Sequence, residues 1–281
     1  MKNLWILVIF TVLIVMGCSE SSTEPEIVSI EREMLLVTGG SFEMGNDQAD
    51  GNANEYPQHA VSVGSFYMSN REVTQGEFTA LMGNIPADRY GIGDNYPVYQ
   101  VTWEMALEYC NLLSEQEGLT PCYNLANSTC NWSADGYRLP TEAEWEFAVK
   151  GGSENVYPGS DDINDVAWYY YNSDNQAHEV ALKAPNALGF YDMSGNVWEW
   201  CWDYYSDSYY SRSETNNPHG PSMGERRVVR GGCWFSDMYS CCCSFRSVCQ
   251  SYGSCYIGFR VVRNAESNRP WGVVLDTHPL K

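Results

Sequence analysis

Residues 186–200 read NALGFYDMSGNVWEW and form the stretch from which the fold is inferred. Small turn-forming residues surround Gly195, and two large indoles follow at Trp198 and Trp200. Glycine allows the backbone angles of a tight turn, and Trp side chains bury large apolar surfaces. Taken alone, the stretch predicts a structural turn whose aromatic residues enter the core.

Outward from this stretch, the chain is rich in Gly, Asn, Asp, Ser, Tyr and Trp, and apolar residues alternate only over short distances. Helices are predicted to begin after Thr74, Thr102 and Thr141, and Glu77 and Glu144 complete capping boxes with the first and third of these. The runs that predict short strands are residues 34–37, 61–67, 227–230 and 258–262. Together these features predict a loop-rich α+β domain.

The third predicted helix carries Glu142 and Glu146 on one face, with Lys150 four residues further on. Two carboxylates on one face can perform acid-base chemistry. Opposite charges at this helical spacing are more typical of a solvated surface. We therefore predict that this face of the helix is exposed to solvent.

The first residues have the pattern of an export signal. Lys2 is followed by an apolar run over residues 4–16, which is short for the ~20 residues of a membrane-spanning helix. The order Val-Met-Gly-Cys at 15–18 resembles a bacterial lipobox, although a cleaved signal with an incidental cysteine stays an alternative. We expect a signal peptide over 1–17, a lipid on Cys18, a flexible tether over 18–33, and an exported bacterial lipoprotein anchored at the periplasmic face or cell surface.

The charge balance excludes one class of partner. The chain has 36 acidic and 16 basic residues, giving a net charge of −20. Binding to a polyanion needs a basic face, so nucleic acid is not an expected partner. The 44% hydrophobic and 14% aromatic content is sufficient for a folded core.

Several phrases, in order along the chain, resemble the sulfatase-modifying-factor (formylglycine-generating enzyme) family. They are GGSFEMG at 39–45, EVT at 72–74, PV at 97–98, VTW at 101–103, YRLPTEAEWE at 137–146, the stretch 186–200, RGG at 230–232 and GFR at 258–260. The resemblance runs over residues 34–263 and implies one domain with a C-type-lectin-like fold, followed by a tail over 264–281.

The resemblance also implies a structural calcium ion. Carried over to this chain, its ligands are the side chains of Asp192 and Glu199 and the carbonyls of Gly195 and Val197. Several oxygens from one tight loop suit a hard cation such as Ca²⁺.

The enzymes of this family oxidise a sulfatase cysteine to formylglycine with copper held by two cysteine thiolates, a soft-ligand site suited to Cu(I). The family spacing after Gly231-Gly232 falls on Ser236 and Cys241, so one thiolate of the pair is missing. A relocated copper pair of Cys233 and Cys241 is the catalytic alternative. We favour a non-catalytic protein.

Residues 234–256 have an unusual composition, because sixteen of the 23 are Ser, Cys, Tyr or Phe. A packed core uses Leu, Ile and Val instead. The composition resembles the variable region of diversity-generating-retroelement proteins, and Tyr and Ser suit adaptable binding. The alternative is a cysteine-rich loop with disulfides. We predict contacts to a protein or small surface ligand from Phe235, Ser236, Asp237, Tyr239, Phe245, Tyr252 and Tyr256.

Overall fold

The computed structural model describes residues 32–47, 51–250 and 256–265. The predicted signal peptide, Cys18 and Tyr252 lie outside the described residues. Among the described residues, no helix has the length and apolarity needed to cross a membrane.

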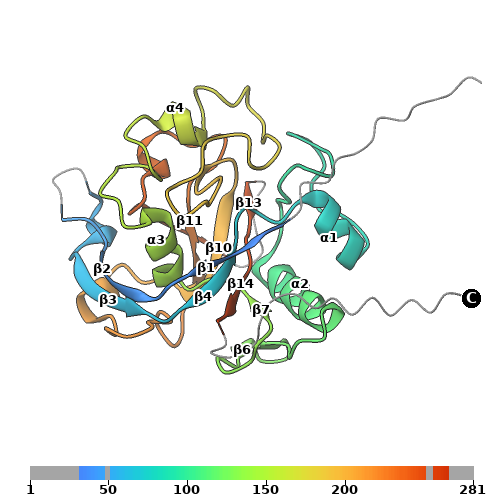
Figure 1. The fold of residues 1–281 in the computed structure, drawn as a ribbon, viewed down its shortest axis with the longest axis horizontal. Helices are drawn as coiled ribbons and strands as arrows, with labels where there is room; N and C mark the ends of the chain where they lie inside the picture. The colour runs from blue at the N-terminus through green and yellow to red at the C-terminus, as the bar shows by residue number, and fades with distance from the viewer. Residues whose placement is uncertain (1–31, 48–50, 251–255, 266–281) are drawn as a thin grey trace, which may run out of the picture.

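Two four-stranded sheets form the centre of the domain (Figure 1). The first is antiparallel and has the order β1 (Met34–Val37), β4 (Phe66–Ser69), β14 (Val262–Asn264), β7 (Tyr137–Arg138). The second has the order β12 (Arg246–Gln250), β11 (Arg226–Arg230), β10 (Trp198–Tyr204), β13 (Ile257–Gly258), with only β13 parallel to its neighbour. The C-terminal residues 257–264 therefore contribute a strand to each sheet.

Short elements surround these sheets. Three two-stranded pairs join β2 (Gly40–Met44) to β3 (His59–Val63), β5 (Tyr123–Asn124) to β6 (Thr129–Cys130), and β8 (Ala167–Trp168) to β9 (Ser194–Gly195). The helices are α1 (Gln75–Met82), α2 (Trp103–Gln116), α3 (Glu142–Lys150) and α4 (Ile163–Val166), with 3₁₀ turns at Ala53–Glu55, Tyr210–Arg212 and Tyr239–Cys241. Much of the chain is loop, which confirms the loop-rich α+β prediction.

The helix starts are as predicted. The hydroxyls of Thr74, Thr102 and Thr141 accept hydrogen bonds from the backbone N–H three residues later, at 3.3, 3.1 and 3.2 Å. These bonds satisfy amide groups that the first turn of a helix leaves without a partner. The strand predictions were too long in two places, because 61–67 is divided at residues 64–65 and 258–262 is divided between β13 and β14.

The core lies on both sides of the sheets. α1 and α2 cover one side with a cluster that includes Trp103, Trp200 and Phe259, and α3 covers the other with Trp145 and Phe66 (Figure 1). These side chains are fully or almost fully buried. Trp200 enters the core as the sequence predicted.

The predicted solvated face of α3 is wrong. Glu142 and Glu146 are fully buried, and Arg230 binds both, at 3.0 and 2.7 Å. Arg246 forms a second ion pair with Glu142 at 2.6 Å. The helical spacing placed the carboxylates correctly on one face, but that face packs against β11 and β12, whose arginines supply the compensating charge.

Candidate ligand-binding surface

An exposed group of aromatic rings is built from three loops and the residue before β13. We call these rings the aromatic surface: Tyr90, Tyr170, Tyr171, Trp234, Phe235 and Tyr256. The Phe235 ring stacks on Tyr256 with centroids 5.8 Å apart, and Tyr170 meets Phe235 edge to face at 5.6 Å. Trp234 contacts Tyr90 and Tyr256 at 5.1 and 5.0 Å. Large exposed apolar groups that touch one another are typical of interaction sites.

The exposure of these rings is uneven. Trp234 is buried and packs beneath Phe235, whereas Phe235 and Tyr170 are each 49% exposed and Tyr171 is 73% exposed. A buried aromatic residue therefore fixes the base of the surface, and its neighbours present their rings to solvent. Rigid aromatic groups lose little side-chain freedom when they bind a partner.

Backbone hydrogen bonds hold the three loops together. The Tyr170 N–H donates to the Ser236 carbonyl at 3.0 Å, and the Ser173 hydroxyl donates to the Trp234 carbonyl at 2.7 Å. The Ala177 N–H donates to the Tyr90 carbonyl at 3.0 Å. Two of these bonds join main-chain atoms and the third joins the Ser173 hydroxyl to a main-chain carbonyl, so the aromatic surface is preorganised by contacts that do not involve the rings it displays.

The predicted ligand residues fall into two places. Phe235 and Tyr256 lie in the aromatic surface, whereas Tyr239 and Phe245 line a separate cavity of about 270 Å³ together with Lys150. Phe245 also lines a neighbouring hollow of about 450 Å³. The prediction grouped these residues because they are close in sequence, but the fold assigns them to different places.

Ser236 and Asp237 are used by their own turn. The Ser236 hydroxyl accepts from the Cys233 N–H at 3.0 Å, and the Asp237 carboxylate accepts from the Ser240 N–H at 2.9 Å. Asp237 is nevertheless exposed, so its charge faces solvent. Within the described residues these two side chains therefore shape the loop that follows Trp234 and Phe235.

The described cysteines, including those around this turn, form no disulfide bond with one another. Cys233 and Cys241 are buried, and the Cys233 sulfur lies 3.3 Å from the Ser236 hydroxyl. Burial, and then the nearby Cys233, raises the pKa of the Cys241 thiol well above its usual range. The Cys241 thiol therefore keeps its proton at neutral pH.

In the loop 192–199, the two predicted carboxylates have different surroundings. The Glu199 carboxylate is held by the Arg260 guanidinium at 2.6 and 2.7 Å and accepts the Trp145 indole N–H at 2.8 Å. Asp192 accepts from the Ala181 N–H through one oxygen, and its buried Oδ1 has no partner among the described residues. Burial raises the pKa of Asp192 to about 6.

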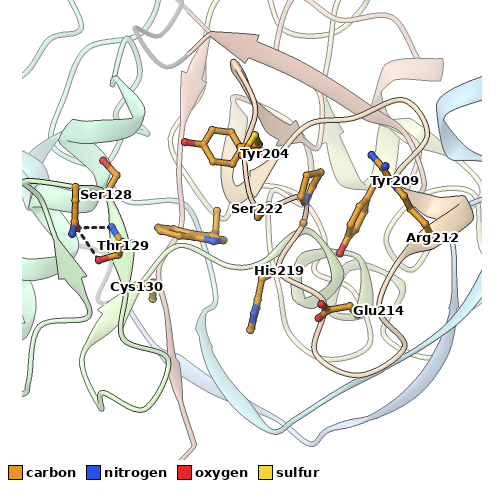
Figure 2. A pocket seen from close by; sticks show the side chains of 14 residues that line it. Ser128, Thr129, Cys130, Tyr204, Tyr209, Arg212, Glu214, His219 and Ser222 are labelled. Atoms are coloured by element: carbon orange, nitrogen blue, oxygen red, sulfur yellow. Dashed lines mark hydrogen bonds between the residues drawn. The ribbon is translucent and has the colours of Figure 1, made fainter.

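A larger cavity, of about 840 Å³, lies elsewhere (Figure 2). The β5–β6 hairpin supplies Ser128 and Thr129 to one wall, and the loop after β10 supplies Tyr209 and His219 to the other. None of the described residues of the segment 233–257 lines it. It is therefore distinct from the aromatic surface, and no sequence motif predicted it.

Sequence reasoning also missed four of the six rings of the aromatic surface, namely Trp234 and the three tyrosines outside the segment 234–256. Tyr90, Tyr170 and Tyr171 lie far along the chain from the segment 234–256, and only the fold brings them to it. One signal was present, since residues 169–171 read Tyr-Tyr-Tyr in a loop-rich region where such a run has no core helix or strand to fill. Tyr169 enters a small core cluster, and Tyr170 and Tyr171 are left exposed.

Comparison with known families agrees with this architecture. Residues 20–265 match the sulfatase-modifying factor enzyme 1-like domain. The chain belongs to this family. It is 28% identical over 292 residues to the formylglycine-generating enzyme of Streptomyces coelicolor, which covers 84% of this chain and 90% of that protein.

Two further proteins are similar to this chain. The Chaperone protein LppX of Paenibacillus barcinonensis is 32% identical over 269 residues, covering 83% of this chain and 89% of that one. The solved structure of Treponema denticola variable protein 1 superposes with a TM-score of 0.76 at 31% identity, covering 85% of this chain and 98% of that one. The C-type-lectin-like fold of the sulfatase-modifying factor family is thereby confirmed.

The family's metal sites fit this chain unequally. At the copper positions, Ser236 offers a hydroxyl where the enzymes have a thiolate, so the two-thiolate site does not fit there. At the calcium loop, the free Oδ1 of Asp192 fits a cation, whereas Glu199 is already satisfied by Arg260 and Trp145. No group of three or more His, Cys, Asp or Glu side chains in the described ranges is arranged to hold a metal ion. Calcium binding stays a prediction that rests on Asp192.

Proposed function

We propose that this chain is a non-catalytic binding protein that captures a ligand on the aromatic surface. The observation that carries this proposal is a set of touching, half-exposed rings fixed from below by buried Trp234 and from the side by main-chain hydrogen bonds. Catalysis is not favoured, because Ser236 occupies the position of a family thiolate. A fold shared with enzymes does not decide activity, which depends on the residues of the site.

A pair of matched variants tests the use of this surface. Phe235→Ser removes a central ring, and Leu125→Ser removes an equally exposed apolar side chain, 48% against 49%, from the β5–β6 hairpin. Peptides that bind the whole, unchanged chain are selected from a random library. Their affinities for the unchanged chain and for the two variants are then compared by biolayer interferometry. We expect Phe235→Ser to weaken binding at least tenfold, the size of a hot-spot residue, and Leu125→Ser to leave it unchanged. Equal affinities for both variants would contradict the proposal.

We propose that residues 233–256, which include Trp234, Phe235 and Tyr256 of this surface, form a diversified segment. The composition of this segment and the similarity to a protein named variable protein 1 both support the idea. The structure adds a sharper expectation, because Arg246 lies inside the segment yet is buried against Glu142. Sequencing the gene from independent isolates should find substitutions concentrated in this segment, with Arg246 constant. Variation spread evenly along the gene would refute diversification.

Export and anchoring through Cys18 form a separate proposal. The apolar run and the Val-Met-Gly-Cys order support a lipid on this cysteine. In cells fed radiolabelled palmitate, the full chain should be labelled and should sediment with membranes. Cys18→Ala should be unlabelled, whereas Cys130→Ala, the control, should behave as the unchanged chain. Labelling of Cys18→Ala would rule out the anchor.

A further inference from the structure

We infer that the partner captured by the aromatic surface is a basic protein segment, bound through Lys or Arg side chains placed against exposed aromatic faces. The inference rests on the proposed function and names the chemistry of its ligand. It is carried by the angles between the rings, by the carboxylates on the same loops and by the extent of the surface.

The exposed rings form an open corner. Tyr170 is nearly perpendicular to Tyr171, at 87° with centroids 5.2 Å apart, and it meets Phe235 at 74°. These three are among the most exposed large side chains described. A cation is attracted to the face of an aromatic ring, and rings set at steep angles allow one cation to meet more than one ring.

Carboxylates accompany this corner. Asp237 follows Ser236, whose carbonyl binds the Tyr170 N–H, and Asp174 follows Ser173, whose hydroxyl binds the Trp234 carbonyl. Both carboxylates are exposed. Two of the three loop contacts that build the aromatic surface therefore also have an exposed carboxylate next to them in sequence.

The described Lys and Arg side chains of these loops are already engaged within the chain. Lys183 lies over the Trp168 ring, 4.1 Å from its centroid, and donates to the Asn164 carbonyl at 2.7 Å. Arg89 lies beside Tyr90 and pairs with Asp88 at 3.2 Å. With net charge −20 on the whole chain, the local and the long-range fields both favour a positively charged partner. Fields of this kind increase association rates and weaken with added salt.

The surface is larger than one ammonium group needs. Its six rings are linked through successive centroid distances of 5.1, 5.0, 5.8, 5.6 and 5.2 Å, from Tyr90 through Trp234, Tyr256, Phe235 and Tyr170 to Tyr171. A small quaternary ammonium ligand would cover only one corner of it. A polypeptide segment with two or more basic side chains can contact the five rings that lie above buried Trp234, which is the reason for assigning a protein partner.

The test uses the whole chain and a random peptide library as the probe. We expect the selected peptides to be enriched in Lys and Arg, and their affinity to fall at least fivefold between low and high salt. The double variant Asp174→Asn and Asp237→Asn should lower the affinity for the selected peptides about three- to tenfold. Asn keeps a side-chain oxygen for the Ser240 N–H, so the loop retains its cap. The matched control is Asp161→Asn with Asp162→Asn, two exposed carboxylates of a separate loop.

The outcomes separate the two proposals. Selected peptides that are neutral or acidic, that ignore salt, and that still depend on Phe235 would overturn the basic partner and leave the binding function standing. Peptides that bind equally well to Phe235→Ser, or a selection that returns none, would overturn the binding function itself. Choline chloride at millimolar concentration, added as a competitor, should not displace the peptides. Displacement by choline would point to a small ammonium ligand in place of a protein.

Discussion

The segment that follows β11 contains exposed side chains, whereas the arginines within it and at its two ends are buried. Phe235, Met238 and Tyr239 are exposed, whereas Arg230, Arg246 and Arg260 are almost fully buried. The hydrophobic side chains face water and the charged ones lie inside, which reverses the usual distribution. The difference indicates that the arginines fix the ends and the middle of the segment, and that its exposed side chains are available to contact a ligand.

Each of these three arginines has a carboxylate partner from another part of the chain. Arg230 and Arg246 share Glu142 of α3, and Arg260 holds Glu199 of β10. A buried ion pair adds little net stability over apolar residues, but losing one member leaves the other charge uncompensated. We call these three arginines and their carboxylate partners the framework. Single substitutions in the framework should therefore destabilise the fold, whereas single substitutions in the exposed surface should not.

The largest effect is expected at Glu142. Glu142→Gln removes the charge that two buried arginines share and should lower the free energy of unfolding by about 3–5 kcal/mol. Urea denaturation followed by tryptophan fluorescence measures this change. The control is Glu108→Gln on the exposed face of α2, which should stay within about 0.5 kcal/mol. A loss at Glu142 no greater than the control's would show that the arginines do not form the framework.

The next effect is a pH dependence from Asp203, which is buried beside Glu142. Burial, and then the Glu142 charge, raises the pKa of Asp203 to about 8. Because the folded state holds the proton more tightly than the unfolded state, the stabilisation is complete below the ordinary pKa of Asp and is lost as the pH rises toward 8.

The free energy of unfolding should therefore fall between pH 6 and pH 8 by on the order of 1 kcal/mol per pH unit, relative to Asp203→Asn. The Asn variant does not titrate and keeps an acceptor for the Glu142 N–H. Parallel pH profiles of the two proteins would mean that Asp203 is ionised throughout this range.

Changes in the exposed surface should cost little stability. Phe235→Ser and Tyr239→Ser remove side chains that are largely in water, so each should lower the free energy of unfolding by about 1 kcal/mol or less. Differential scanning calorimetry compares them with Glu142→Gln. If either serine variant approached the Glu142 effect, the division between framework and surface would fail.

The smallest effect is expected from removing calcium. Arg260 already satisfies Glu199, so chelation with EDTA should lower the melting temperature by only about 1–2 °C, through the loss of an ion at Asp192. Asp192→Asn should then make the protein insensitive to EDTA. A fall of more than about 5 °C in the unchanged chain would show that an ion, and not Arg260, is the main support of this loop.

Local chemistry was readable from the sequence. Thr74 and Thr141 begin helices because their hydroxyls and the following glutamates satisfy the first amide groups, and this depends only on residues three apart. Phe235 and Tyr256 were identified from composition, and both lie in the aromatic surface. The family resemblance along 34–263 indicated the fold, because its phrases occur in a fixed order.

Tertiary structure alone decided which side of each element is buried and which loops meet. Glu142 and Glu146 have the spacing of a solvated helix face, yet arginines from two distant strands pair with them inside the core. Tyr90 and Tyr170 join Trp234 and Phe235 only because backbone bonds bring their loops together. A sequence determines capping and composition, which are local, whereas charge compensation and surface assembly depend on partners that only the folded chain brings within reach.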